Sequence, residues 1–212
     1  PFTWLASICS IIEYRIKHTD RHHTMVTTNK IEWSRKYEKA FRAILPLYLK
    51  NIKVTKGNGS VLRRLKKLFV KSIYNFGSSS KLIQREVDEV PNNHKDSVII
   101  QVRLLGEGWD PKGAWLDSWS FADPTSSKIR IYQTGGRSAR IGDDIFKATM
   151  FESHCVVPLI VQSDLTKEIA INKAFRQLRL VAESMQIGTE TIEDSVDFLP
   201  WQNMNIAGQS TR

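Results

Sequence analysis

The stretch that decides the fold is Val98–Arg140, which reads VIIQVRLLGEGWDPKGAWLDSWSFADPTSSKIRIYQTGGRSAR. Its first residues, Val98–Val102, form an apolar run rich in β-branched side chains, which is typical of a strand buried on both faces. A turn at 111–113 separates this run from a second expected strand at 116–121. Residues 126–133 are expected to form a helix that ends at the Gly135–Gly136 pair.

The rest of the chain repeats this alternation of strands and helices. Asn29 with Glu32 three positions later predicts a capped helix that stops at Pro46. Further helices are expected at 2–17, 61–73, 81–90 and 166–186, and further strands at 24–27, 52–54 and 155–161. Pro158 favours an edge position or a bulge for the last strand. The sequence therefore predicts an α/β fold with a mainly parallel central sheet and helices on both of its faces.

Length and composition exclude several classes of protein. The chain has 212 residues, enough for one domain of ordinary size, and 41% of them are hydrophobic, as in globular proteins. No apolar run approaches the roughly 18 residues of a membrane span, so no membrane partner is expected. Two distant cysteines favour an intracellular protein, cytoplasmic or nuclear and not secreted. A start at Pro1 without methionine suggests a fragment of a longer chain.

The positive charge of the chain is concentrated in its central part. The formal net charge is +9, which favours polyanionic partners. Between Lys50 and Lys81 there is no acidic residue, whereas Glu183–Asp197 contains acids and no bases. The predicted helix at 61–73 places its basic residues on one outer face, which is either a phosphate contact or a solvated surface.

Two motifs contain residues suited to binding or catalysis, and each also has a purely structural interpretation. After the strand ending near Val102, Gly108 and Asp110 lie in a glycine-rich turn where a ribose hydroxyl or a metal-bound group can be met. The same pattern is equally a structural turn in which Asp110 caps the backbone. Further on, Arg137 and Arg140 are three residues apart and can neutralise a transferring phosphoryl group, with Gln133 orienting a water. The alternative there is a solvated basic turn.

Together and in this order, the two stretches resemble motifs five and six of the carboxyl-terminal RecA-like lobe of superfamily two DEAD/DEAH-type helicases. Motif six of that family is Gln-x-x-Gly-Arg-x-x-Arg, and Gln133, Gly136, Arg137 and Arg140 match every fixed position. Gly108 and Asp110 match the Gly-x-Asp of motif five, and residues 24–29 are similar to motif four. The resemblance covers about residues 24–161 and implies a RecA-like three-layer sandwich.

The resemblance also implies a role for each matched residue. Arg137 and Arg140 would be arginine fingers on the γ-phosphate of ATP, and Gln133 would contact that phosphate or the attacking water. Asp110 would face the ribose, with Gly108 and Gly136 beside the nucleotide. Residues 27–30 would hold the phosphates of DNA or RNA through hydroxyls and amide hydrogens at a helix start. These four residues are Thr27, Thr28, Asn29 and Lys30.

The sequence lacks the motifs that belong to the amino-terminal lobe of helicases in that family. There is no Gly-x-x-x-x-Gly-Lys-Ser/Thr loop and no acidic quartet, so the ATP-bound Mg²⁺ would be held by an amino-terminal lobe in cis or in trans. Residues 1–20 are then expected to be a remnant of the interlobe connection, 21–165 the RecA-like domain, and 166–212 a helix with an acidic tail. The chain alone would be half of an ATP hydrolase. The alternative is a non-catalytic nucleic-acid-binding module with the same fold.

Other polar and aromatic clusters give weaker signals. His18, His22 and His23 offer too few ligands for a zinc site, so no metal site is expected. Trp33, Trp115 and Trp119 can stack on bases, although core packing is the favoured explanation for most of them.

Overall fold

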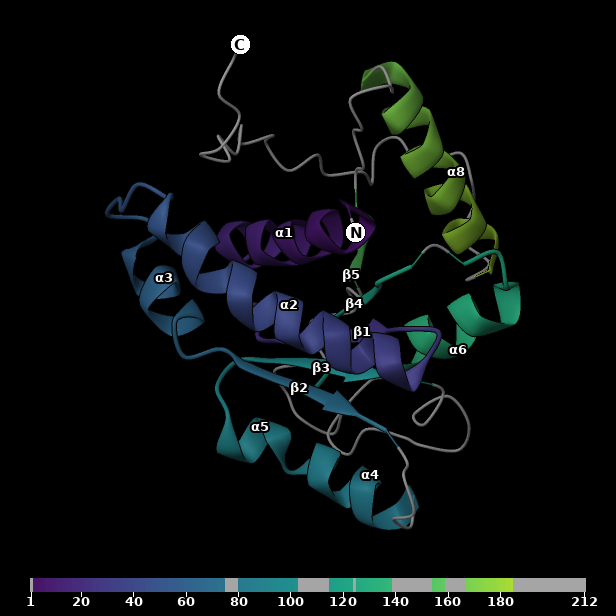
Figure 1. Cartoon of the computed structure of the whole chain (residues 1–212), viewed down its shortest axis with the longest axis horizontal. Coiled ribbons are helices and arrows are strands. Elements are labelled where there is room, and N and C mark those ends of the chain that lie inside the picture. Colours follow the sequence, from purple (N-terminus) through teal and green to yellow (C-terminus); the bar gives the residue numbers. More distant parts are fainter. Residues whose placement is uncertain are drawn as a thin grey trace.

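The computed structural model describes residues 2–74, 80–102, 115–123, 125–138, 154–158 and 167–184. Within these ranges, five strands form one all-parallel sheet in the order β2-β3-β1-β4-β5 (Figure 1). The strands are β1 (His23–Thr27), β2 (Phe69–Ile73), β3 (Ser97–Gln101), β4 (Ser118–Phe121) and β5 (His154–Val156). The predicted α/β fold with a parallel central sheet is confirmed.

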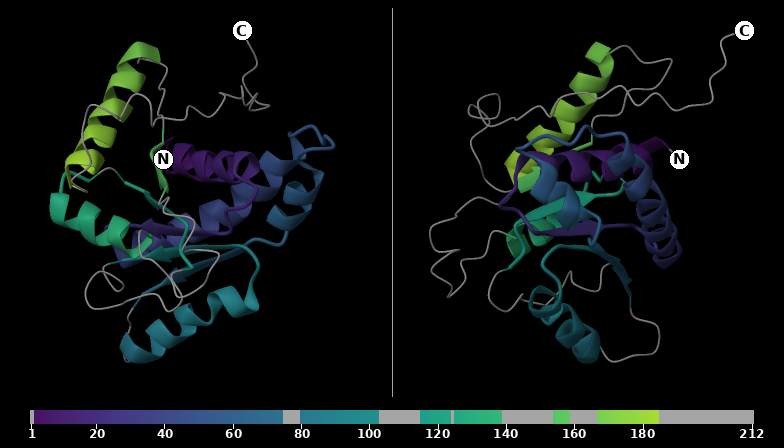
Figure 2. Two further views of the ribbon diagram at one scale, coloured as in Figure 1. Left: turned by 180° about the vertical axis from the view of Figure 1, so that it is seen from behind. Right: turned by 90° about the vertical axis from the view of Figure 1, so that its left-hand side faces the viewer.

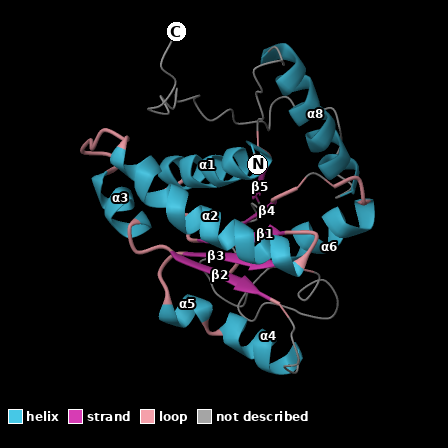
Figure 3. Ribbon diagram, in the orientation of Figure 1, coloured by secondary structure: helices cyan, strands magenta, loops and turns pink. Residues whose placement is uncertain are grey.

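Helices cover both faces of this sheet, as Figures 2 and 3 show. They are α1 (Phe2–Lys17), α2 (Ile31–Lys50), α3 (Gly59–Leu65), α4 (Ser80–Asp88), α5 (Val90–Asn93), α6 (Lys128–Ser138) and α8 (Lys167–Ser184). No helix among the described residues is long and apolar enough to cross a membrane.

The two faces of the sheet have separate apolar cores, because successive side chains of a strand point to opposite faces. On one face, Val26, Val70 and Ile100 pack against α1, α2 and α3. On the other face, Met25 and Ile99 pack against α4 and α5, and Trp119 packs with Ile131 of α6 and Val181 of α8. This arrangement is a three-layer sandwich.

Four strands end level with one another at the carboxyl edge of the sheet. Thr27 of β1 pairs with Gln101 of β3 and with Phe121 of β4, and Ile73 of β2 pairs with Gln101. The loops that follow these strands therefore start side by side. Ligands of parallel α/β sheets bind at this edge.

The opposite, amino edge of the sheet is closed by a buried arginine. Arg15 of α1 is 0% exposed and donates to the Thr24 hydroxyl at 2.7 Å and to the Ser97 carbonyl at 2.6 Å. Its guanidinium also lies 3.4 Å from the Asp96 carboxylate, whose other oxygen is 2.8 Å from Nε of Arg64. The ion pairs and hydrogen bonds at this edge thus connect α1 and α3 to the strands.

A buried histidine adjoins this network. His23 begins β1, and its Nδ1 lies 2.9 Å from the Ser97 hydroxyl. Burial lowers the pKa of His23 to about 4, although the nearby Asp117 carboxylate acts in the opposite direction. Asp117 accepts hydrogen bonds from the backbone N–H groups of His22 and His23, at 2.6 and 2.9 Å. His23 is therefore neutral in the folded chain near neutral pH.

The prediction that Pro46 ends its helix is wrong, because α2 continues to Lys50. Pro46 removes one backbone hydrogen bond. Beyond it, Tyr48 and Leu49 are buried against the core, and this packing holds the last turn. Residues 52–54, predicted as a strand, lie in the turn and coil that follow α2.

The single basic helix predicted at 61–73 is also wrong. The helix α3 ends at Leu65, Lys66 and Lys67 form an exposed turn, and the strand β2 begins at Phe69. Val70 and Ser72 are buried in β2, which pairs in parallel with β3. Pairing with a central strand outweighs the helical spacing of the apolar residues.

Candidate functional site at the carboxyl edge

The β1–α2 loop, residues 28–30, lies at the centre of the carboxyl edge. Its first amide, the N–H of Thr28, donates to the Gln101 carbonyl at 2.9 Å, across to β3. On the other side, the Ala122 N–H donates to the Thr27 carbonyl at 3.0 Å, which ties the end of β4 to the same point. The loop that holds the predicted nucleic-acid residues is therefore anchored from both neighbouring strands.

The two threonines of the predicted nucleic-acid set are buried. Thr27 is 2% exposed, and its hydroxyl oxygen accepts a 2.9 Å hydrogen bond from the Gln101 side-chain amide. Thr28 is 1% exposed, and its hydroxyl lies 3.4 Å from the carbonyl oxygens of Lys30 and Gln101. In this structure both hydroxyls contact protein, so the exposed members of the set are Asn29, which is partly exposed, and Lys30.

The start of α2 differs from the predicted capping box. Lys30 is the N-cap, with extended backbone (φ −139°, ψ 149°), and no side chain caps the first turn. Glu32 instead pairs with Lys36, at 2.5 Å. The helix begins one residue later than predicted, so Asn29 is not its N-cap, and the Asn29 side-chain oxygen accepts a hydrogen bond from Arg130 of α6. Lys30 places its ammonium 5.1 Å from the Trp33 ring, so a cation stands at the positive end of this helix.

The helix α6 follows β4 and carries part of the predicted nucleotide site. Gln133 is half-buried in it, and the backbones of Gly136 and Arg137 lie in its last turn. The predicted break at Gly135–Gly136 is wrong, since α6 continues to Ser138. Glycine lowers helix stability by only about 1 kcal/mol, and Ile131 and Thr134 of this helix are buried. Gly108, Asp110 and Arg140 lie outside the described residues.

Arg130 joins α6 to the β1–α2 loop. One guanidinium nitrogen of Arg130 donates to the Thr28 carbonyl at 3.1 Å, and the other donates to the side-chain oxygen of Asn29. These partners are 102 and 101 residues away in sequence. The structure thus connects the predicted motif-six helix directly with the predicted motif-four loop. Sequence analysis missed this residue, although it lies one helical turn before Gln133.

A second contact fixes the end of β4. Asp123, two residues after the strand, accepts a 3.0 Å hydrogen bond from the indole N–H of Trp4 in α1. Trp4 also contacts the rings of Trp33 and Tyr37 edge-on, with centroids 6.4 and 5.9 Å apart. The start of α1 is therefore held close to the carboxyl edge.

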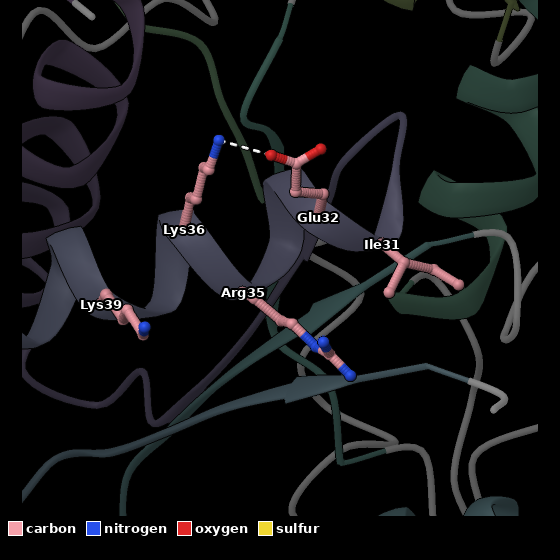
Figure 4. A pocket seen from close by; sticks show the side chains of 5 residues that line it. All are labelled: Ile31, Glu32, Arg35, Lys36 and Lys39. Atoms are coloured by element: carbon pink, nitrogen blue, oxygen red, sulfur yellow. Dashed lines mark ion pairs between the residues drawn. The ribbon is translucent and has the colours of Figure 1, made fainter.

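The outer face of α2 presents further cations, and it carries an open hollow of about 420 Å³ (Figure 4). The described residues that line it are Ile31, Glu32, Arg35, Lys36 and Lys39. Arg35 lies over the ring of Tyr74, 4.5 Å from its centroid, directly after β2. The lining thus combines three cations with the apolar Ile31 and the acidic Glu32.

The helix α2 is fixed to β2 by one carboxylate. Glu38 accepts hydrogen bonds from the amide and the hydroxyl of Ser72, at 2.8 and 2.6 Å, and from Arg42 at 3.0 Å. Burial acts to raise the pKa of Glu38, but these hydrogen bonds outweigh it and hold the pKa below its usual value. The charged Glu38 keeps the basic face of α2 in place over the edge strand.

The tryptophans and histidines have mainly structural positions. Trp119 is 2% exposed in the core beside α6, and Trp115 packs partly buried beside Leu116. Trp33 is partly exposed at the carboxyl edge. Within the described ranges, no group of three or more His, Cys, Asp or Glu side chains could hold a metal ion.

Comparison of the sequence with protein-family models and with curated proteins gives no match. Among solved structures, the chain is similar to the ATP-dependent Type ISP restriction-modification enzyme LlaBIII bound to DNA, with a TM-score of 0.52 and 20% identity. This similarity covers 82% of the chain and 10% of that enzyme, so the chain spans about a tenth of the enzyme's length. It shows a shared fold. The C-terminal part of the Fun30 ATPase domain is a weaker match, with a TM-score of 0.39, 10% identity, and coverage of 81% of this chain and 50% of that one.

Proposed function

We propose that this chain is the carboxyl-terminal RecA-like lobe of an ATP-dependent helicase or translocase that acts on DNA or RNA. The observation that supports this most is the convergence of two elements at one edge of the parallel sheet. The β1–α2 loop and the helix α6, which the family resemblance assigns to nucleic acid and to ATP, are in direct contact there through Arg130. The fold shared with part of an ATP-dependent enzyme agrees with this proposal.

The proposed ATP site lies between this lobe and a phosphate-binding lobe. Arg137 and Arg140 would reach the γ-phosphate from α6 and the residues after it, and Gln133 would orient the attacking water. Asp110 would accept a hydrogen bond from the ribose. Guanidinium and amide donors suit phosphate oxygens, whereas Mg²⁺ needs carboxylate oxygens, which the partner lobe would supply. Bound Mg²⁺ would neutralise charge on the β- and γ-phosphates.

The nucleic-acid backbone would follow the start of α2. Lys30 is exposed there, and the first turn of a 20-residue helix presents N–H groups and a positive dipole end. Arg35, Lys36 and Lys39 continue the positive charge along the outer face of α2. The hydroxyls of Thr27 and Thr28 would contact phosphate only after giving up their present contacts within the protein, so backbone amides and Lys30 carry the first contacts.

The test is ATP turnover in the polypeptide that joins this lobe to its phosphate-binding lobe. Arg137→Ala is expected to lower turnover by about 10³- to 10⁵-fold while leaving nucleic-acid affinity nearly unchanged. Arg176→Ala, an exposed arginine of α8, is the matched control and should turn over ATP normally. Near-normal turnover in Arg137→Ala would refute the arginine-finger assignment. Binding of nucleic acid without any turnover in the unsubstituted polypeptide would instead support the non-catalytic module.

A further inference from the structure

We infer that Arg130 is the positioning residue that couples nucleic-acid binding to ATP hydrolysis, an inference that rests on the proposed function. Arg130 is half-buried in α6 and donates two hydrogen bonds to the β1–α2 loop. Neither bond is made to a group that the family resemblance assigns to ATP. Its proposed role is to fix the relative position of two protein elements.

The loop residues that Arg130 contacts adjoin the proposed nucleic-acid site, so a movement of that site would change the contact. Thr28 and Asn29, the two partners of Arg130, directly precede Lys30 and the start of α2. The Asn29 side-chain oxygen accepts a hydrogen bond from Arg130, and the next residue, Lys30, is the N-cap of α2. A phosphate bound by Lys30 and the first amides of α2 would therefore shift the segment to which Arg130 is hydrogen-bonded.

The helix side of the contact leads to the proposed catalytic groups. Positions 130, 133 and 137 follow one another at i, i+3 and i+7, and so they lie on one stripe of α6. Ile131 is buried in the core with Trp119, Phe121 and Val181. Because α6 is packed as one rigid element, a shift at Arg130 would move the backbones of Gln133 and Arg137 with it.

The geometry of the contact favours arginine over any other cation. Two nitrogens of one planar group reach two different acceptors, the Thr28 carbonyl and the Asn29 side-chain oxygen. A lysine ammonium keeps the charge but does not reproduce this fork. Arg130→Lys is therefore expected to lose the coupling although the charge of the lobe is unchanged.

The experiment measures ATP turnover of the two-lobed polypeptide with and without saturating poly(dT) or poly(U). In Arg130→Met and Arg130→Lys, the ratio of stimulated to basal turnover is expected to fall about fivefold or more, the usual lower range of allosteric coupling. The nucleic-acid concentration that gives half-maximal stimulation should change little, since the proposed role of Arg130 is to act through the loop and not to bind nucleic acid itself. Lys128→Met, which removes a cation from the same helix, should keep the full stimulation.

A second variant approaches the contact from the loop, in case Arg130→Met fails to fold. Asn29→Ala removes one acceptor and is expected to lower the saturating stimulation as well. Combining it with Arg130→Lys should add little further loss, because both changes break the same contact. Hydrogen exchange at residues 28–31 should be faster in each variant, with β1 and β3 unchanged.

Wild-type stimulation in Arg130→Met, or independent additive losses in the double variant, would overturn this inference. If Arg137→Ala still abolishes turnover in that case, the proposed function stands and only the coupling role fails. If the unsubstituted polypeptide shows no turnover with either polymer, the proposed function fails and the coupling role fails with it.

Discussion

The two edges of the central sheet use charge in opposite ways. At the amino edge, Arg15, Asp96 and Arg64 form a network in which Arg15 is fully buried and each charge meets a protein partner. At the carboxyl edge, Lys30 is exposed, and Arg130 donates hydrogen bonds to the Thr28 carbonyl and to the Asn29 side-chain oxygen. The amino-edge network stabilises the fold, whereas the proposed function uses the exposed charge at the carboxyl edge to bind a polyanion.

The largest expected effect is at the amino edge. Asp96→Asn removes the negative charge from a buried network and leaves Arg15 without its carboxylate, which should lower the free energy of unfolding by about 3–5 kcal/mol. Urea unfolding of the chain measures this loss. Glu183→Gln, which breaks the exposed pair with Lys128, should cost about 0–1 kcal/mol. Equal losses of the free energy of unfolding in the two variants would contradict the expected difference between the buried network and the exposed ion pair.

The same edge should make stability depend on pH through His23. Its pKa is lowered from 6.5 in the unfolded chain to about 4, so the unfolded state binds more protons between these values. The free energy of unfolding should therefore be constant above pH 6.5 and fall by about 3 kcal/mol in total as the pH drops to 4. His23→Gln should flatten this part of the profile in urea unfolding, while His94→Gln, which leaves His23 in place, should keep it. An unchanged profile in His23→Gln would assign the effect to other groups.

At the carboxyl edge, a smaller loss of stability is expected from the side chain that anchors Thr27. Gln101→Ala leaves the buried Thr27 hydroxyl without its 2.9 Å donor, at a cost of about 1–3 kcal/mol. Gln84→Ala on α4, a half-buried glutamine outside the sheet, should change the free energy of unfolding by less than about 0.5 kcal/mol. Thermal or urea unfolding of both variants compares them. A neutral Gln101→Ala would show that the anchor does not hold the loop.

The smallest effect on stability, and a clear effect on binding, is expected for Lys30. Lys30→Ala should leave the free energy of unfolding within about 0.5 kcal/mol, because the side chain is exposed. It should weaken nucleic-acid binding and reduce the slope of log affinity against log salt by about 1. Lys95→Ala, an exposed lysine at the amino edge, is the control and should change neither. Equal slopes for the two variants would contradict the separation of the edges.

The strands that form the centre of the sheet could be predicted from sequence. Val98–Val102 is a short apolar run, residues 24–27 are a strand-sized stretch after a histidine pair, and the structure places β3 and β1 there. Burial on both faces makes such strands nearly continuously hydrophobic, so their pattern is local. The long helix at 166–186 was likewise predicted from its spacing and is observed as α8.

Elements whose stability comes from distant partners could not be predicted in this way. The strand β2 has helical spacing of apolar residues and is fixed by pairing with β3. Pro46 and Gly135 disfavour a helix locally, yet both lie within helices that are packed on the core.

The place of two candidate residues in the fold could be predicted from sequence, whereas their contacts could not. The resemblance selected Asn29 and Lys30, and both lie at the carboxyl edge. The contact that links them to α6 depends on Arg130, which is 101 residues from Asn29 and carries no motif of its own. The burial of the Thr27 hydroxyl against Gln101 depends equally on the register of β1 with β3. Such pairings follow from topology, which a linear pattern does not contain.

The most direct test is a structure of the two-lobed polypeptide with Mg²⁺ and a non-hydrolysable ATP analogue. The expected result is that the guanidinium groups of Arg137 and Arg140 lie within hydrogen-bond distance of the γ-phosphate, at the edge where Asp110 meets the ribose. Ion pairs that tie both arginines to carboxylates within this lobe, away from the nucleotide, would contradict the account.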